Sequence, residues 1–564
     1  MATIIKKKVR NQTYYYAVES KRVDGKPRIV WQQYLGKLED ITRRASQKPA
    51  TPVAAKVFDF GAAAAYFHIA KQIGLVELID QHAPKRKQGA TVGQYMLIAA
   101  INRALHPVSK SEMADWFSGT CLPKWTGIPN KQLTSQRFWD HMDRLDEQTI
   151  NAIEESLTRR LVEQFQLDLR CLLYDATNFY TYISSSSEES LPQYGHNKAK
   201  RTDLKQVSLA LMVSSDFHIP LLHQVYPGNR NDSDQFSKII SSLAQRYQSI
   251  TSSCDKVTLV FDKGNNSKAN VPSLQQTPFH FVGSLTPSYQ ADLLEIPMDQ
   301  FQTLTEPRLG GVSSYRVRKE VFGAKRTVVI TYSEDLYLAN MKNSIAQRYK
   351  ANDDLQKLQV HAAKSCDTSK RGRKISKESV EKEVMSILKG RGLKSNWLQY
   401  RIEEQAEGGF ILTYNWDQTA IEEHQKKVFG KTILFTDHET WSDAEIILAY
   451  RGQAKIEEAF RKMKDTEFLC WDPRYHWTDQ KIRVHAFYCV LALTLTSLLQ
   501  RQLAQQGLTL SAAKMIHTLA GIQEVVNIYP EASGIKPQVV LTALTELQSQ
   551  MFEKLELGQY RMLS

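Results

Sequence analysis

The chain has 564 residues, too many for one hydrophobic core, and its 42% hydrophobic and 10% aromatic content is typical of folded protein, so we expect several globular domains. The formal net charge of +13 favours a polyanionic partner such as nucleic acid, although a charge that serves only solubility explains it equally well. Six scattered cysteines without a C-x-x-C pair argue against a zinc site and a disulfide framework, and they fit a reducing compartment.

The first predicted element is a small β structure in residues 1–48. Residues alternate in β fashion through Thr13–Val18 and Arg28–Trp31, and Asp24-Gly25 between them predicts the turn of a hairpin or a three-strand meander. The lysines from Lys6 to Lys8 can contact DNA from such a sheet, but a sheet that only packs on its neighbour is equally consistent. No apolar segment follows these charges, so we expect no secretory signal.

Helical periodicity follows over residues 55–166, after a polar linker with Pro49 and Pro52. Asp146 is placed to cap the last of the predicted helices. The predicted helices are Ala62–Ile73, Thr91–Leu105, Glu112–Phe117, Ser135–Leu145 and Glu147–Phe165.

Strand-like runs begin after residue 168, and two of them carry an aspartate. The apolar runs Leu172–Asp175 and Val257–Asp262 each reach an Asp and then break into polar or Gly residues. Such runs predict buried strands with the acid at the carboxyl end, where the active sites of open α/β sheets collect. The predicted order is strands at Cys171–Tyr180, Gln206–Ser214 and Leu221–Tyr226, a helix at Asp234–Gln248, and the strand that ends at Asp262.

The stretch between Asp262 and the next motif is far longer than a connection within a compact fold needs, so it predicts an inserted domain over 285–440. Its pattern mixes strands and helices. The predicted elements are strands at Tyr315–Val321 and Arg326–Tyr332, helices at Leu336–Lys364 and Lys377–Leu388, and strands at Trp397–Ile402, Gly409–Thr413 and Lys431–Thr436.

A helix is predicted over Ala449–Lys464, with a cap in Ser442–Glu445. Ile456, Phe460 and Met463 form its buried stripe, and Glu457 lies on a second stripe that borders it. The second stripe consists of Tyr450, Gln453, Glu457, Arg461 and Lys464. Taken alone, this pattern also fits an ordinary amphipathic helix with i, i+4 ion pairs. Together with Asp175 and Asp262, however, Glu457 completes an all-oxygen ligand set that suits Mg²⁺ or Mn²⁺ rather than zinc.

These residues resemble a known family. Asp175, Asp262 and Glu457 are similar to the acidic triad of the DDE transposases of bacterial insertion sequences. The helix resembles that family's Tyr-Arg-Glu-Lys signature, in which Tyr450, Glu457 and Lys464 keep the spacing. Gln453 stands where the family has Arg, and its amide can still donate a hydrogen bond.

The resemblance implies an α/β fold in which a ribonuclease H-like catalytic domain is split around the large insertion. We expect its two parts at 168–284 and 441–508, with the inserted α/β domain at 285–440 and a helical tail at 509–564. The helical domain at 55–166 is where such transposases often place DNA recognition. The most apolar run, Ala486–Leu499, is too short to span a bilayer comfortably, and we expect it to be a buried helix.

The implied function is that of a transposase, which binds terminal inverted repeats and catalyses metal-dependent DNA cleavage and strand transfer. Asp175, Asp262 and Glu457 would hold Mg²⁺ or Mn²⁺, two ions rather than one. The residues implied to contact DNA are Tyr450, Gln453, Arg461, Lys464 and Lys263. The implied partners are double-stranded DNA, both the repeats and the target, and a second copy of the chain. We expect a cytoplasmic, nucleoid-associated bacterial protein without a membrane partner.

Two alternatives remain open at this stage. The first is a ribonuclease H-like nuclease that cleaves without strand transfer. The second is a catalytically inactive DNA-binding protein descended from a transposase, for which Gln453 is the residue that hints at decay.

Overall fold

The computed structural model describes most of the chain, and the following account is confined to that part. It covers residues 2–561 apart from 11, 24–25, 47–50, 85–87, 184–186, 188, 196–200, 231–234, 237, 243, 245–246, 248–256, 263–269, 288, 364–375, 406–408, 466–469 and 472–475. The chain forms two units. One consists of Met1–Ala65, Asp115–Gly127 and Ala513–Ser564, and the other of Tyr66–Ala114 and Ile128–Ala512.

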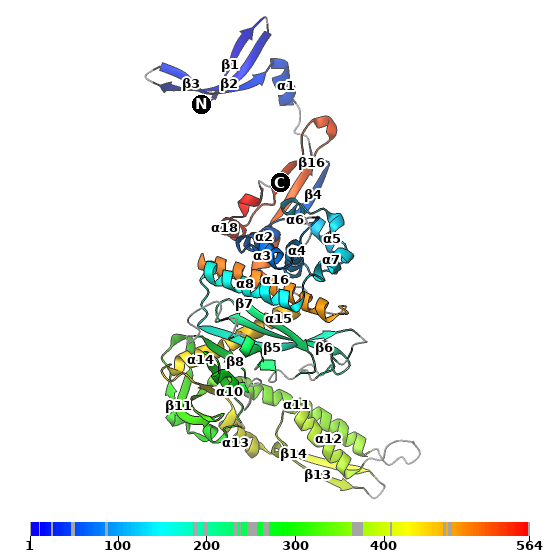
Figure 1. Cartoon of the computed structure of the whole chain (residues 1–564), viewed down its shortest axis with the longest axis vertical. Helices are drawn as coiled ribbons and strands as arrows, with labels where there is room; N and C mark the ends of the chain where they lie inside the picture. Colours follow the sequence, from blue (N-terminus) through cyan, green and yellow to red (C-terminus); the bar gives the residue numbers. More distant parts are fainter. Residues whose placement is uncertain are drawn as a thin grey trace, which may run out of the picture. The chain divides into compact units, whose positions relative to one another are not determined.

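The first unit contains two antiparallel three-stranded sheets (Figure 1). In the first sheet β1 (Ala2–Val9), β2 (Gln12–Val23) and β3 (Lys26–Gly36) pair in chain order, and α1 (Leu38–Ser46) follows. In the second sheet β16 (Gln523–Ile528) lies between β17 (Gln538–Leu541) and β4 (Ala54–Asp59).

The second sheet corrects two predictions. The region 55–166, predicted to be helical, begins with the strand β4, and the predicted helical tail over 509–564 contains β16 and β17 as well as α17 (Ala512–Ala520) and α18 (Glu546–Lys554). The physical reason is strand pairing between distant segments. Val525 lies between Val57 of β4 and Val540 of β17, and such β-branched residues pack well across neighbouring strands.

Helices make up most of the chain between β4 and residue 166. Asp146 caps α8 by accepting a hydrogen bond from the Thr149 N–H, as its position in the sequence predicts. The helices are α2 (Gly61–Gln72), α3 (Leu75–His82), α4 (Val92–Leu105), α5 (Met113–Ser118), α6 (Leu122–Thr126), α7 (Ser135–Met142) and α8 (Glu147–Phe165).

A nine-stranded mixed sheet organises the second unit, in the order β10-β11-β12-β15-β9-β8-β5-β6-β7. β5, β6 and β7 are antiparallel neighbours, whereas β8 and β9 run parallel to β5. This half of the sheet consists of β5 (Cys171–Thr181), β6 (Lys205–Ser214), β7 (Pro220–Pro227), β8 (Thr258–Phe261) and β9 (His280–Leu285). The predicted strand ranges agree with these bounds to within a residue or two. The helix predicted at Asp234–Gln248 lies partly outside the described residues, and those described between 235 and 247 are helical.

The segment 285–440 extends this sheet and also forms a smaller core of its own. Its sheet strands are β10 (Gln302–Thr303), β11 (Val312–Val321), β12 (Ala324–Ser333) and β15 (Lys431–Thr436). Its smaller core includes Leu355, Val384 and Trp397. The elements around that core are α11 (Glu334–Ala363), α12 (Lys377–Gly390), β13 (Leu398–Glu404), β14 (Phe410–Trp416) and α13 (Gln418–Val428).

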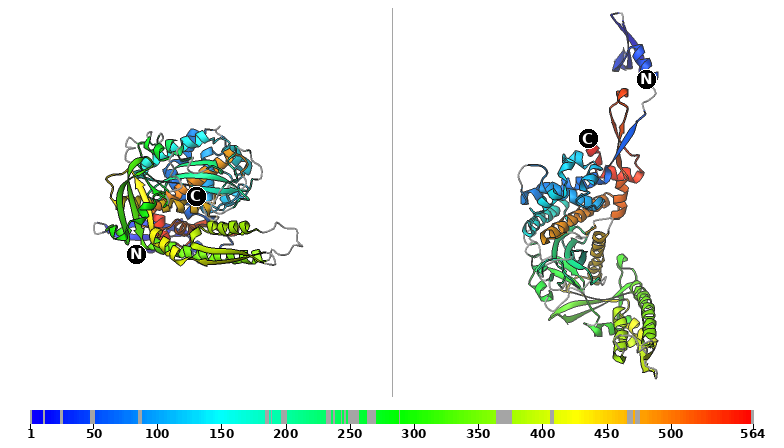
Figure 2. Two further views of the ribbon diagram at one scale, coloured as in Figure 1. Left: turned by 90° about the horizontal axis from the view of Figure 1, so that it is seen from below. Right: turned by 90° about the vertical axis from the view of Figure 1, so that its right-hand side faces the viewer.

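Two long helices, α8 and α16 (Asp479–Gln505), contact each other and β7 on one side of the nine-stranded sheet (Figures 1 and 2). By length and composition α16 is apolar enough to cross a membrane, but 94% of its most apolar window is buried in the protein. All residues of Ala486–Leu499 are buried, which confirms the prediction of a buried helix there.

Candidate active site

Asp175 and Asp262 lie side by side on neighbouring parallel strands. Tyr174 of β5 pairs with Phe261 of β8, and each aspartate is the next residue along its strand. Parallel strands are about 4.8 Å apart, so the two carboxylates leave the sheet from adjacent positions. Asp175 lies inside β5 rather than at its end, because β5 continues to Thr181 in its pairing with β6 after its pairing with β8 has stopped.

Both aspartates face the same side of the sheet. The rings of Tyr174 and Phe261 contact the Phe236 ring, with centroids 5.1 and 5.0 Å from it. Successive side chains of a strand alternate between faces, so Asp175 and Asp262 point to the opposite face. Both side chains are half-buried, and Asp175 Oδ1 accepts a hydrogen bond of 2.8 Å from the Ala176 N–H.

The helix that covers this face is interrupted at Gly452, which corrects the prediction of one helix over Ala449–Lys464. α14 (Asp443–Arg451) ends before Gly452, and α15 (Gln453–Lys464) begins after it. A Cβ at Gly452 would lie 3.1 Å from Leu173 Cδ2 and 3.0 Å from the Ala449 carbonyl oxygen. The backbone can therefore approach β5 this closely only because residue 452 has no side chain.

Tyr450, at the end of α14, is directed at Asp262. Its hydroxyl lies 3.1 Å from Asp262 Oδ1 and 2.8 Å from Ser284 Oγ. Ser284 Oγ in turn lies 3.3 Å from the same carboxylate oxygen, so both hydroxyls are placed to donate to it. Burial raises the pKa of the Tyr450 hydroxyl well above its ordinary value, and the negative charges of Asp262 and Glu457 act in the same direction. Tyr450 thus stays protonated and acts as a donor to the acid.

Two hydrogen bonds fix α15 against β5, one on each side of Asp175. Near its start, Gln453 Nε2 donates to the Tyr174 carbonyl oxygen over 2.9 Å. At its end, Lys464 Nζ donates to Thr177 Oγ1 over 2.6 Å and lies 5.3 Å from the centroid of the Phe179 ring. Between these contacts the predicted apolar stripe of Ile456, Phe460 and Met463 is buried, as the helical spacing indicates, and Ala459 is buried with it.

Glu457 lies on the same side of α15 as its two attachments. It follows Gln453 by four residues and precedes Lys464 by seven. These spacings are close to one and two helical turns, so the three side chains project from nearly the same side of α15. Its side chain is exposed, and its charge contributes to the raised pKa of Tyr450, which lies beside Asp262. The structure therefore brings all three predicted acids to one side of the sheet.

The donor chemistry of these acids fits a hard divalent cation. In the part of the chain that the structure describes, neither Asp262 nor Glu457 forms an ion pair. Within that same part, no group of three His, Cys, Asp or Glu side chains is arranged to hold a metal ion. Asp175 and Asp262 nevertheless offer carboxylate oxygens from neighbouring strands, which suit such a cation, and Glu457 does not join them in a three-residue group.

The remaining predicted site residues differ in their surroundings. Gln453 is 6% exposed and donates to the Tyr174 carbonyl oxygen, and its contact with DNA stays a prediction. Arg461 and Lys464 are exposed on α15, and Lys263 lies outside the described residues. Ser284 was not predicted. The available signal was a single hydroxyl in the apolar run of β9, on the strand next to that of Asp262.

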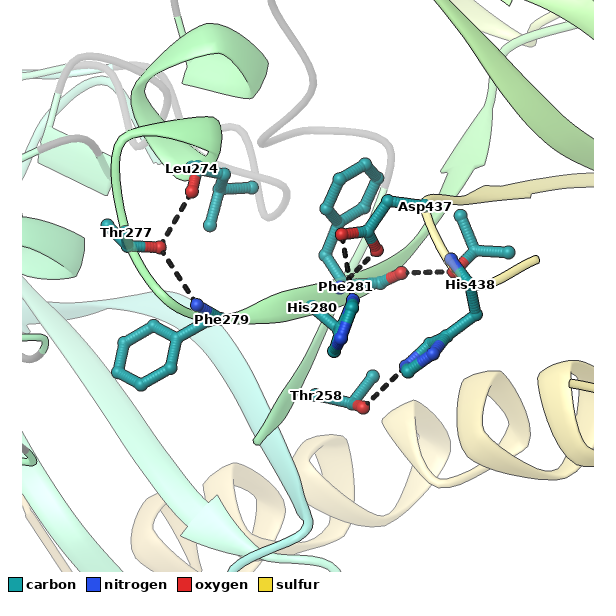
Figure 3. Close-up of polar contacts among 9 residues, drawn as sticks. Thr258, Leu274, Thr277, Phe279, His280, Phe281, Asp437 and His438 are labelled. Carbon is teal, nitrogen blue, oxygen red and sulfur yellow. Dashed lines mark hydrogen bonds and ion pairs between the residues drawn. The ribbon is translucent and has the colours of Figure 1, made fainter. Parts of the chain in front are cut away.

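A second polar cluster, also unpredicted, lies at the opposite ends of the same strands (Figure 3). Asp437, just after β15, accepts from His280 Nδ1 over 3.0 Å and from the Phe281 N–H over 2.9 Å. His438 Nε2 lies 2.8 Å from Thr258 Oγ1, and its ring stacks on that of Trp441 at 3.8 Å between centroids. Thr258 and His280 begin β8 and β9, so this cluster joins the end of β15 to the starts of the two parallel strands.

The electrostatics of the second cluster favour a neutral His438. Burial lowers the pKa of the His438 imidazole to about 4, and the neighbouring His280 acts in the same direction. Asp437 and Glu445 oppose this shift without cancelling it. His438 is therefore uncharged near neutral pH, and the cluster forms a structural junction between β15, β8 and β9.

Comparison with known proteins adds the family. Residues 166–495 match the family model described as "Transposase DDE domain", a range that includes Asp175, Asp262 and Glu457. No curated protein matches the chain. Among solved structures, the chain is similar to one titled "Cryo-EM structure of piggyBac transposase synaptic complex with hairpin DNA", at 8% identity and a TM-score of 0.35. That alignment covers 84% of this chain and 82% of the other.

Proposed function

The chain belongs to the transposase DDE domain family, and from this premise we propose that it binds the terminal inverted repeats of an insertion sequence and catalyses DNA cleavage and strand transfer. The observation that carries the proposal is the placement of Asp175 and Asp262 on adjacent parallel strands, on the face where α15 presents Glu457. Active sites of open α/β sheets lie at the carboxyl ends of such strands.

A ribonuclease H-like catalytic domain is part of this proposal. Its support is the order β7-β6-β5-β8-β9, in which the first strand in the chain is central, the second and third lie to one side, and the fourth and fifth lie to the other. The acids then belong to the first and fourth of these strands, and the third acid to a helix that follows the insertion.

Asp175 and Asp262 would hold divalent cations, Mg²⁺ or Mn²⁺ in a pair, with Glu457 as a further ligand. When bound, such cations supply positive charge at the scissile phosphate and make water a better nucleophile near neutral pH. The chain's own contribution is orientation. Tyr450 and Ser284 fix one oxygen of Asp262, and Gln453 holds α15 at the residue that precedes Asp175.

The exposed cations of α15 suit contacts with DNA phosphates. Lys464 lies beside the face of β5 that carries Asp175, and Arg461 lies one turn earlier on the helix. Lys263 follows Asp262 in the sequence and stays a proposed phosphate contact. The partner is double-stranded DNA, and a homodimer would bring two element ends together. We place the protein at the bacterial nucleoid, where its DNA substrate is.

The test is cleavage of a labelled duplex that carries the DNA flanking the gene, in Mg²⁺, by the full chain. Asp175→Asn, Asp262→Asn and Glu457→Gln should each abolish cleavage and leave duplex binding within about threefold. Glu458→Gln is the matched control, because this glutamate lies next in the chain and forms an ion pair with Lys462 at 3.5 Å. Cleavage by Glu457→Gln at the rate of the unmodified chain would overturn the assignment.

A substrate that already ends in a 3′-hydroxyl separates the alternatives. Joining of this end to target DNA supports the transposase, whereas cleavage without joining supports a nuclease. Duplex binding with neither activity supports an inactive DNA-binding protein.

A further inference from the structure

The N-terminal sheet of β1, β2 and β3, drawn in Figure 1, carries several basic residues whose strand pairing places them on one face. Strand pairing defines this face, because residues directly opposite each other in an antiparallel pair project to the same side. Lys6 pairs with Tyr15, Lys8 with Thr13, Lys21 with Arg28, and Lys26 with Val23. In β2, Thr13, Tyr15 and Lys21 occupy odd positions of an alternating strand, so they share one side of the sheet, and Lys26 shares it because it lies two residues before Arg28 in β3. We call this side the cationic face: Lys6, Lys8, Lys21, Lys26 and Arg28, all of them exposed.

The chain supplies little to balance these charges. Lys21 lies directly opposite Arg28, and like charges at directly opposed positions destabilise a sheet. Among the residues that the structure describes, no ion pair involves any member of the cationic face. Glu19, opposite Trp31, is the acid that the described part of this face contains. A face of this kind gains stability from an anionic partner.

In the part that the structure describes, the strands of this sheet bury almost no apolar side chains. The charges are therefore not simply the outer face of a sheet whose other face covers a core. Val18 is the buried apolar side chain that the structure describes in β1, β2 and β3. Every residue of β3 is exposed except the last two, and Trp31, on the cationic face, is 47% exposed. Exposed aromatic and basic side chains on one strand surface suit the sugar-phosphate backbone and groove of a duplex, which admits a β-ribbon.

We propose that the cationic face binds the phosphate backbone of double-stranded DNA. The inference rests on the proposed function, which makes DNA the polyanion that this chain meets, and it adds a DNA-binding surface in the N-terminal sheet. Phosphate contacts of this kind fix the position of a protein on DNA without reading its sequence. The cationic face would therefore strengthen binding to repeats and to target DNA alike.

The experiment is fluorescence anisotropy with a labelled duplex of arbitrary sequence, in EDTA, at several salt concentrations, so that cleavage does not contribute. The test variant is the full chain with Lys6→Gln, Lys8→Gln and Lys21→Gln. The matched control carries Lys377→Gln, Lys382→Gln and Lys389→Gln, three exposed lysines of α12. We expect the dissociation constant of the test variant to rise on the order of tenfold, and the slope of log affinity against log salt to fall by about 0.9 per lost contact. Lys6→Arg, Lys8→Arg and Lys21→Arg should restore both values, which separates charge loss from misfolding.

Each other outcome overturns the inference in its own way. If the dissociation constant of the test variant rises no more than that of the control, the cationic face does not bind DNA. The proposed function is then judged separately by the cleavage test. If the Gln variant instead loses self-association and keeps its DNA affinity, the face binds a second copy. If the unmodified chain binds no duplex at all, both the inference and the proposed function fail.

Discussion

The Tyr450 hydroxyl lies 3.1 Å from Asp262 Oδ1, across the interval that separates α14 from the end of β8. The first residue of the helical motif therefore contacts an acid from which the whole inserted segment separates it in the sequence. This relationship supports a positioning role for Tyr450 at Asp262, and the direct DNA contact that the motif suggests stays a prediction.

Removal of the Tyr450 hydroxyl should weaken Asp262 as a ligand. Tyr450→Phe keeps the ring and removes one of the two donors to the carboxylate, and the loss of such an outer contact typically costs about 10- to 100-fold in metal affinity or activity. The measurement is the Mg²⁺ concentration that gives half-maximal cleavage, which should rise. Tyr349→Phe, on a tyrosine that is 72% exposed on α11, is the control. An unchanged Mg²⁺ dependence together with weaker DNA binding would return Tyr450 to a DNA-contacting role.

Loss of the Gln453 amide should lower stability rather than DNA affinity. Gln453→Ala leaves the buried Tyr174 carbonyl without this donor, at a cost of about 1–3 kcal/mol in the free energy of unfolding. Thermal denaturation measures the loss, and Gln418→Ala, at an exposed position of α13, should cost much less. A drop in duplex affinity without a change in stability would contradict the inward placement of Gln453.

A side chain at residue 452 should push α15 away from β5. Gly452→Val places methyl groups against Leu173 and the Ala449 carbonyl, and overpacking of this kind costs about 1–3 kcal/mol. Leu173→Ala creates space at the same contact, so the cost of the double variant should be smaller than the sum of the single costs. Chemical denaturation of the unmodified chain, the two single variants and the double variant measures the coupling free energy between the two positions. Strict additivity would show that Gly452 and Leu173 do not share a contact.

The junction around His438 should make the protein less stable in mild acid. The folded state depresses the pKa of His438 to about 4 from an ordinary value near 6.5, so the unfolded chain binds the proton more readily. The contribution of His438 to the free energy of unfolding is thus fully present above about pH 6.5 and is lost as the pH falls toward 4. His438→Gln, which keeps a donor for Thr258, should reduce this part of the pH dependence of the melting temperature. His361→Gln, on the surface of α11, should leave it unchanged.

Local patterns determined much of this chain without reference to its tertiary structure. α8 begins after Asp146 and ends at Phe165 as predicted, because a cap and an apolar stripe are encoded within the helix itself. The strands that carry Asp175 and precede Asp262 follow from short apolar runs, and the buried stripe beside Glu457 follows from helical spacing. Each of these features depends on residues within a few positions of one another.

Only the tertiary structure decided which of these residues meet. Gly452, at the break between α14 and α15, lies close to Leu173 of β5, and Ser284 reaches Asp262 because β9 pairs with β8. β16 pairs with β4 from the other end of the chain, so no local window distinguishes it from the helices around it. The inward turn of Gln453 likewise follows from the buried Tyr174 carbonyl that it satisfies. Periodicity specifies which side of an element is buried, but the partner on that side is chosen by packing between segments that are distant in the sequence.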